Sequence, residues 1–265
     1  METEEELKKL AIQSPSPDEV ANRAVEQHPK FPHAVKAAKV INTIGLGGAG
    51  LTVVVYVIKA IVGWYSPLLD IAPLILIILM PLLILIVAAF RGLIGYNIRM
   101  SIPNPSVFPA MFSISVAILL YGSLPTHVEY LPMLKAAGIL ALFLVLLVFL
   151  STPEFKKLTK LDIGNLLGIF SLLFSYSYGA YTTSNCALDN QPPKILSTII
   201  TEKYISRAGD ANSYYLYFVP VKEIDVNRME ASDVLYWSVE KGDSLYIKIN
   251  PGRWHSPWYY MSAER

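Results

Sequence analysis

Five long apolar runs divide the first 181 residues of the chain, and short loops separate them. The run from Ile71 to Phe90 contains no charged residue. A helix needs roughly 20 predominantly apolar residues to cross a hydrocarbon core about 30 Å thick, and a helix that is apolar on every side is buried in a large core or in a membrane. Since 53% of the residues are hydrophobic and only 16% are charged, the chain is predicted to be a multi-pass membrane protein in contact with the lipid bilayer.

The loops between these runs differ in their basic residues. Lys and Arg precede the first run and lie between the second and third and between the fourth and fifth, at Lys30, Lys36, Lys39, Arg91, Arg99, Lys156, Lys157 and Lys160. Residues 63–67 and 125–132 contain neither Lys nor Arg. Because short cytoplasmic loops retain Lys and Arg, the N-terminus is predicted to be cytoplasmic. An odd number of spans then places the C-terminus on the outer side.

These patterns predict three parts. Residues 1–39 form a cytoplasmic N-terminal segment with short helices, because Thr3 with Glu6 and Ser16 with Glu19 fit capping boxes. Residues 40–181 form a membrane all-α domain of five transmembrane helices, and residues 184–265 form an extracytoplasmic β-domain. The spans are predicted at Val40–Val62, Leu68–Phe90, Ser106–Leu124, Met133–Leu150 and Leu161–Tyr181.

The last part has the composition of a small all-β domain. Ile195–Tyr204 and Tyr214–Val221 are rich in β-branched and aromatic residues, and the turn-forming residues between them predict a β-hairpin. Ser244–Asn250 alternates in polarity, and Trp254–Tyr260 is an aromatic strand candidate. We expect the four or five short strands to form a small barrel or sandwich, because closure protects the edges of a small sheet.

The order of motifs in this domain resembles a known arrangement. Tyr236 is followed by Val239–Asp243, which precedes the alternating strand, and then by Pro251-Gly252 and Trp258-Tyr259. This order resembles the extracytoplasmic tails of uncharacterised bacterial multi-pass inner-membrane proteins. The resemblance implies a bacterial inner membrane and a periplasmic C-terminal domain, and it implies no activity.

Composition and motifs exclude several classes of function. A formal net charge of +1 argues against a nucleic-acid partner. The single cysteine, Cys186, excludes an intramolecular disulfide framework and a Cys-rich metal site. It is either an unpaired small residue at a helix exit, which we favour, or half of an intermolecular disulfide. Motifs of serine hydrolases, zinc proteases and phosphate loops are absent, so no catalytic, cofactor-binding or metal-binding residue is predicted.

A glycine-rich stretch in the first apolar run matches the dinucleotide-binding pattern G-x-G-x-x-G. It extends from Gly45 to Gly50. A dinucleotide fingerprint must follow a strand and open a helix with a solvated face, whereas Leu51–Ile58 is apolar or weakly polar on every side. Small residues in membrane helices instead let neighbouring backbones approach closely. Gly45 and Ala49 are therefore predicted to be helix-packing residues.

Aromatic residues are unusually frequent in the predicted β-domain. Tyr and Trp are enriched at contact surfaces, where their rings bury area and their polar ends hydrogen-bond. Adjacent aromatic pairs in a strand must place one ring on each face, so they cannot all fill one core. The predicted partner-binding residues are Tyr214, Tyr215, Trp237, Trp254, Trp258, Tyr259 and Tyr260.

The sequence favours a non-enzymatic function. The leading hypothesis is an integral membrane protein that positions a periplasmic β-domain to bind envelope proteins or a larger membrane complex. One alternative is an immunity or envelope-protection protein. Another is an accessory subunit of a membrane enzyme or transporter, although no charged residue falls near the middle of a predicted span.

Overall fold

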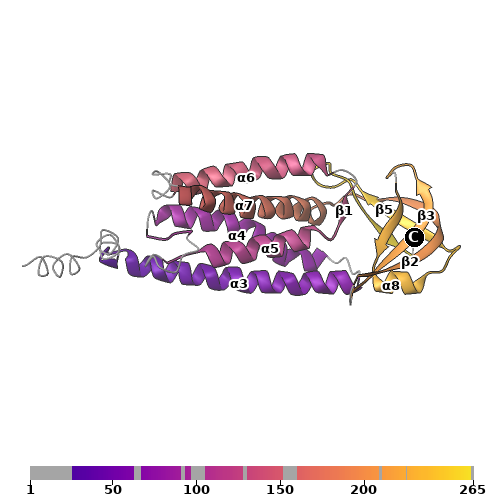
Figure 1. The fold of residues 1–265 in the computed structure, drawn as a ribbon, viewed down its shortest axis with the longest axis horizontal. Coiled ribbons are helices and arrows are strands. Elements are labelled where there is room, and N and C mark those ends of the chain that lie inside the picture. The colour runs from indigo at the N-terminus through magenta and orange to yellow at the C-terminus, as the bar shows by residue number, and fades with distance from the viewer. Residues whose placement is uncertain are drawn as a thin grey trace, which may run out of the picture.

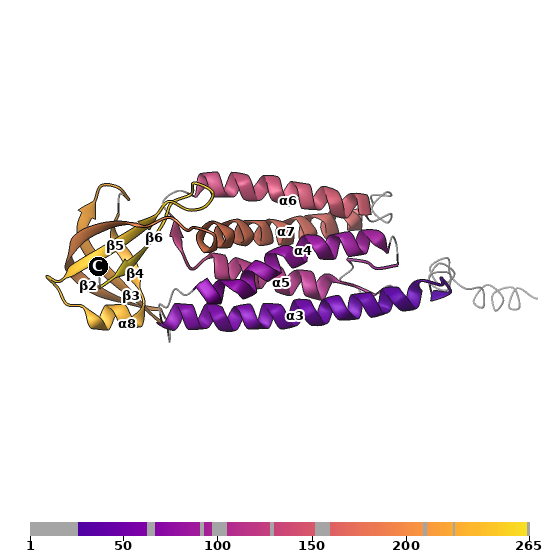
Figure 2. The same cartoon turned by 180° about the vertical axis from the view of Figure 1, so that it is seen from behind.

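A computed structural model describes residues 26–62, 67–90, 93–96, 105–127, 130–151, 160–208, 211–224 and 226–263. The short helices predicted within residues 1–25 lie outside these ranges. Figures 1 and 2 show an elongated molecule in which long helices pack side by side and the β-sheet lies at one end of the bundle.

Each of the five apolar runs forms a long helix, as predicted. The helices are α3 (Phe31–Val62), α4 (Ile71–Ala89), α5 (Phe108–Gly122), α6 (Leu131–Ser151) and α7 (Lys160–Ala187), and a short 3-10 helix, η1 (Pro67–Asp70), precedes α4. Helix α3 begins before the predicted Val40, and α7 continues past the predicted Tyr181. Both helices are thus longer than their apolar runs.

Three helical stretches are long and apolar enough to cross a membrane. They are Phe31–Ala60, Leu68–Ala89 and Leu131–Ser151, while Phe108–Gly122 is apolar but shorter. Large apolar side chains also cover the outside of the bundle, where Ile78 is 68% exposed and Ile139 is 71% exposed. Extensive exposed apolar surface marks an interaction with lipid or protein, so these faces are suited to lipid contact.

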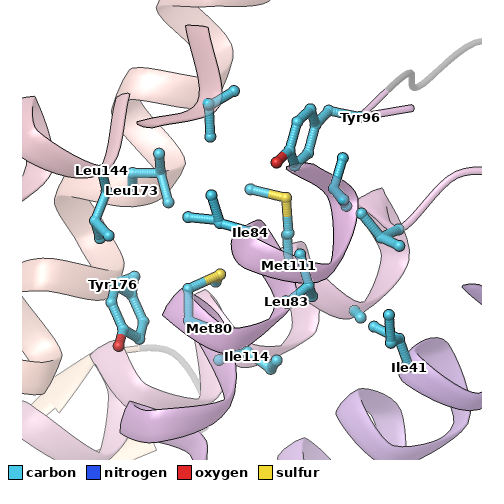
Figure 3. Close-up of a cluster of buried hydrophobic side chains, with 14 of the residues drawn as sticks. Ile41, Met80, Leu83, Ile84, Tyr96, Met111, Ile114, Leu144, Leu173 and Tyr176 are labelled. Atoms are coloured by element: carbon cyan, nitrogen blue, oxygen red, sulfur yellow. The ribbon is translucent and has the colours of Figure 1, made fainter. Parts of the chain in front are cut away.

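The interior of the bundle is a continuous apolar core. Figure 3 shows Met80 and Ile84 of α4 beside Met111 of α5, with Leu173 of α7 and Leu144 of α6 nearby. All five side chains are buried. Helix α5 packs against both α3 and α7, while α6 packs against α7 and α4.

Glycines allow two of these helices to approach α5 closely. A Cβ on Gly45 of α3 would lie 2.7 Å from the Cβ of Ala110, and one on Gly179 of α7 would lie 2.6 Å from the carbonyl carbon of Ile118. Ala49, one turn after Gly45, is 5% exposed and belongs to the core. The glycine-rich stretch lies inside α3 and follows no strand, which is the geometry of helix packing.

The C-terminal part forms an antiparallel half-barrel. Its strands are β2 (Lys194–Ala208), β3 (Ala211–Val221), β4 (Val226–Ala231), β5 (Ser244–Asn250) and β6 (Trp258–Ser262), and a two-residue strand, β1 (Thr126–His127), joins from the loop between α5 and α6. The sheet order is β1-β6-β5-β2-β3-β4. The predicted hairpin is confirmed as β2 and β3, whose last antiparallel pair is Ala208 with Ala211.

The predicted all-β class is confirmed in its coarser form, as an antiparallel half-barrel. In the described part of the chain β4 pairs only with β3, so the sheet stays open on that side. A bulge between Ile200 and Glu202 bends β2, whose first half pairs with β5 and whose second half pairs with β3. The short helix α8 (Asp233–Ser238), capped by the side chain of Ser232, packs against β3 and α3.

We expect Gly179→Ala to destabilise the bundle, because its new methyl group would press on the backbone of α5 at Ile118. Overpacking of this kind lowers the free energy of unfolding by about 1–3 kcal/mol. Thermal unfolding in detergent micelles measures the effect. The control is Gly138→Ala on α6, where a Cβ would meet nothing within 4 Å. Equal melting temperatures for the two variants would contradict this account of α5–α7 packing.

Candidate functional site at the junction of helices and sheet

The end of α7 holds the loop between β5 and β6. The side chain of Asn185, which is 0% exposed, donates from Nδ2 to the carbonyl oxygen of Ser256 at 2.7 Å and accepts at Oδ1 from the backbone N–H of Trp254 at 2.9 Å. The carbonyl oxygen of Asn185 accepts from the backbone N–H of Arg253 at 3.0 Å. One buried residue thus makes three hydrogen bonds across the junction.

Further bonds fix the same loop. Asp189 Oδ2 accepts from the backbone N–H of Gly252 at 2.8 Å, and the hydroxyls of Tyr181 and Ser256 lie 2.8 Å apart. Gly252 has a φ of 75°, and a Cβ there would lie 2.6 Å from the side-chain nitrogen of Asn185. A glycine is therefore required both by the backbone conformation and by the close approach of α7.

A second connection comes from the loop between α5 and α6. Thr126 pairs with Tyr259 and His127 pairs with Trp258, so β1 extends the sheet from within the helical region. The sequence predicts only a loop here, because a strand of two residues is too short to show an alternating pattern. Together the end of α7 and β1 attach the loop before β6 and the first two residues of β6 to the bundle.

A buried ion pair lies where α3, η1 and α5 meet below the sheet. Lys59 Nζ is 2.5 Å from Asp70 Oδ1, and the Tyr121 hydroxyl donates to the same carboxylate oxygen. The Lys59 ammonium also lies 4.9 Å from the centre of the Tyr121 ring. The side chains of Lys59 and Asp70 are only 7% and 16% exposed. Burying these two charges away from water costs free energy. The contact between Lys59 and Asp70 and the hydrogen bond from the Tyr121 hydroxyl offset this cost.

Between this ion pair and the sheet is a cavity of about 220 Å³. We call it the junction cavity. Its lining comes from the ion pair, from the end of α7 and from β5 and β6, and includes Asp70, Thr183, Asp189, Asn250, Trp258 and Tyr260. Elements that are far apart in the sequence therefore contribute polar and aromatic groups to one partly open cavity.

Cys186 also lines the junction cavity. Burial raises the pKa of its thiol well above the ordinary value. A thiol that stays protonated is a poor nucleophile. Its position inside the junction favours the interpretation of Cys186 as an unpaired small residue over an intermolecular disulfide.

The predicted partner-binding residues fall into two groups. Trp254, Trp258, Tyr259 and Tyr260 belong to the junction: Trp254 donates from Nε1 to Ser184 Oγ at 3.0 Å. Trp258 and Tyr259 are only 8% and 5% exposed, so both are core residues of the sheet. Tyr260 stacks on Trp258 with ring centres 5.8 Å apart. Burial raises the pKa of Tyr259 and of Tyr260.

The other group lies on the half-barrel away from the junction. Trp237 is 62% exposed, and its ring centre is 6.1 Å from that of half-buried Tyr214. Tyr215 lies beside Tyr204, which is 48% exposed, and the guanidinium of Arg228 stands 5.0 Å from the centre of the Tyr215 ring. Cation–π stacking places Arg228 with Tyr215 on one face of the sheet, while Tyr214 and Trp237 lie on the other, because Tyr214 and Tyr215 are neighbours in β3. Tyr204 and Arg228 are not among the predicted partner-binding residues. Both contact the predicted Tyr215 from neighbouring strands.

Comparison with known protein families, with curated proteins and with solved structures found no match. Within the described ranges no group of three His, Cys, Asp or Glu side chains could hold a metal ion. Function is therefore inferred from the geometry of this chain.

We expect Asp70→Ala to lower the free energy of unfolding by about 3 kcal/mol, because it leaves the buried Lys59 ammonium without its counter-charge. The double variant Lys59→Met with Asp70→Ala is expected to regain much of this loss, since no unpaired charge remains. Chemical unfolding in micelles provides the measurement.

The matched control for this prediction is Lys194→Ala. It removes an exposed ion pair with Glu223, whose atoms are 3.1 Å apart. Exposed pairs contribute little to stability, so we expect no measurable change. A double variant as unstable as Asp70→Ala alone would show that the ion pair is not the source of the effect.

Proposed function

We propose that this chain is a non-enzymatic integral protein of a bacterial inner membrane, whose five helices hold the β-domain on the periplasmic side to bind envelope partners. The supporting observation is the junction itself. The buried Asn185 side chain and the strand β1 attach the sheet to the bundle at two places. A domain held in this way presents its surfaces at a defined height and orientation above the membrane.

The packing of α5 supports a five-span arrangement, although α5 has only 15 residues. At its start, Asn42 of α3 donates to the carbonyl oxygen of Ser106 at 2.8 Å and accepts from the N–H of Ala110 at 3.2 Å. Near its other end, Tyr121 reaches the Lys59–Asp70 pair. Asn42 and Lys59 are 17 residues apart on α3, or about 25 Å at 1.5 Å per residue. With its flanks, α5 therefore covers most of a hydrocarbon core about 30 Å thick.

The distribution of charge supports the orientation. Lys30, Lys36 and Lys39 lie at the start of α3, and Figures 1 and 2 place this end of the bundle opposite the sheet. Basic residues mark the cytoplasmic side of a membrane protein. The bacterial location rests on the sequence resemblance of the C-terminal motifs.

The outward aromatic group supports a binding role. Tyr204 and Trp237 are large, exposed side chains of the β-domain, and Arg228 stacks across Tyr215 and Tyr217. Trp, Tyr and Arg are the residues that most often dominate protein–protein binding energy. Tyr204, Tyr215 and Arg228 share the face of the sheet that points away from the core, whereas Trp237 stands exposed on α8 beside Tyr214 at the other face.

Reporter fusions test the proposed topology. A phosphatase that is active only outside the cytoplasm, fused after Arg265, should be active, and a fluorescent protein that folds only in the cytoplasm should stay dark at the same position. Fusions at residue 95, between α4 and α5, should give the opposite pair of results because that loop is proposed to be cytoplasmic. A C-terminal fusion that fluoresces would overturn the proposed orientation.

Partner capture tests the binding role. We expect the full-length protein, crosslinked in intact cells and purified in mild detergent, to recover a stoichiometric envelope protein. Trp237→Ala together with Tyr204→Ala should reduce recovery at least tenfold, because hot-spot aromatics contribute about 2 kcal/mol or more each. The control is Lys241→Ala, an exposed residue in the turn before β5. Recovery of the bare chain from the wild type in repeated experiments would contradict the proposal.

A further inference from the structure

We propose that a groove between the start of α3 and the end of α4 binds an anionic phospholipid, with the headgroup at its basic end and an acyl chain along its apolar end. The groove has a volume of about 360 Å³ and is lined by one face of α3 between His33 and Ile41 and by Ile86 and Phe90 of α4. We call it the α3–α4 groove. This site requires that the helices lie in a membrane, but it depends neither on the orientation of the chain nor on a protein partner.

The α3–α4 groove opens on the outside of the bundle. Its α3 residues are spaced by three and four along the helix and so share one face, and they are His33, Lys36, Ala37, Val40 and Ile41. Ala37, Ile86 and Phe90 are half-buried and pack against the bundle core. Val40 is 49% exposed, and both basic side chains are exposed as well. A ligand can therefore reach the lining from the surrounding lipid.

The polarity of the α3–α4 groove changes along the helix axis. His33 and Lys36 lie in the first two turns of α3, and Val40 and Ile41 follow in the apolar run. His33 and Ile41 are eight residues apart, or about 12 Å at 1.5 Å per residue. This length is close to half of a hydrocarbon core about 30 Å thick. A phospholipid in one leaflet has the same order, with a charged headgroup followed by acyl chains.

The charge of the α3–α4 groove selects an anionic headgroup. Lys36 brings a positive charge with three donors, and His33 brings an N–H donor. Helices α3 and α4 contain no acidic residue, and among the described residues no carboxylate lines the groove or forms an ion pair with Lys36. Phosphate oxygens accept strong hydrogen bonds from such donors. Basic pockets between membrane helices bind the headgroups of anionic lipids in the same way.

The test measures lipid binding to the full-length protein in detergent micelles by native mass spectrometry, which counts the lipids retained by each chain. The probes are phosphatidylglycerol, phosphatidylcholine and diacylglycerol with identical acyl chains. We expect one phosphatidylglycerol per chain to bind at least fivefold more tightly than either of the other two lipids, because one basic residue near an anionic headgroup contributes about this factor. The preference should decrease as the ionic strength rises.

One pair of variants tests the charge. Lys36→Gln should weaken phosphatidylglycerol binding about fivefold and leave phosphatidylcholine binding unchanged. The matched control is Lys39→Gln, which removes the same charge from an exposed residue of the same helix that does not line the α3–α4 groove. We expect this control to bind phosphatidylglycerol like the wild type. Equal losses in the two variants would show attraction to a basic surface without a defined site, and would overturn the proposal.

A second pair of variants tests the shape. Val40→Phe places a ring in the α3–α4 groove without changing the charge, and we expect it to weaken phosphatidylglycerol binding at least fivefold. The matched control is Val35→Phe, because Val35 is 41% exposed on α3 and does not line the groove. Both valines are exposed, so both variants should unfold at the temperature of the wild type. Binding that survives Val40→Phe would show that the acyl chain lies elsewhere, against the proposal.

One tightly bound phosphatidylglycerol per chain that depends on both Lys36 and Val40 supports the proposal. Equal affinity for phosphatidylglycerol and for either phosphatidylcholine or diacylglycerol overturns it, because the headgroup charge then selects nothing. Inorganic phosphate at millimolar concentration serves as a competitor. Displacement of the lipid by phosphate shows that the groove binds a free anion, which also overturns the proposal. Capture of an envelope partner by the β-domain is measured separately, so either result can fail without the other.

Discussion

The architecture depends on α7 remaining a helix after its apolar run ends. Beyond Tyr181 the helix carries polar residues for another turn and a half, and the buried Asn185 uses both ends of its amide to hold the backbone of the loop before β6. A buried amide that loses either partner pays the full cost of desolvation. The orientation of the sheet on the bundle is therefore determined by a hydrogen-bonded side chain and not by apolar contact alone.

Packing in the middle of the bundle differs from packing at the end near the sheet. Within the apolar layer the helices pack through side chains such as Met80 and Leu173, and glycines such as Gly179 bring backbones together. Apolar association between helices has no driving force in lipid, so close packing must replace it. At the end near the sheet, Lys59 and Asp70 neutralise each other. This end therefore accommodates two buried charges.

The sequence predicts local features well and non-local ones poorly. The apolar runs predict all five helices, and the aromatic and β-branched segments predict the β2–β3 hairpin, because both patterns are periodic within one element. The opening of the half-barrel depends on which strand meets β4, and the Lys59–Asp70 pair depends on how α3 and η1 meet. Neither has a local pattern. Trp258 is buried where it pairs with the strand β1. A strand of two residues has no recognisable pattern, so the sequence does not predict this pairing.

The candidate site lies where the two kinds of packing meet. A membrane bundle and a half-barrel have surfaces of different shape, so their contact leaves space that neither core fills, and the junction cavity occupies this space. Filling it with apolar side chains would stabilise the junction, because voids and unbonded polar atoms both cost stability. The cavity is lined instead by polar groups such as Asp189 and the Lys59–Asp70 pair. The junction is therefore held together by hydrogen bonds and paired charges at the point where the two apolar cores end.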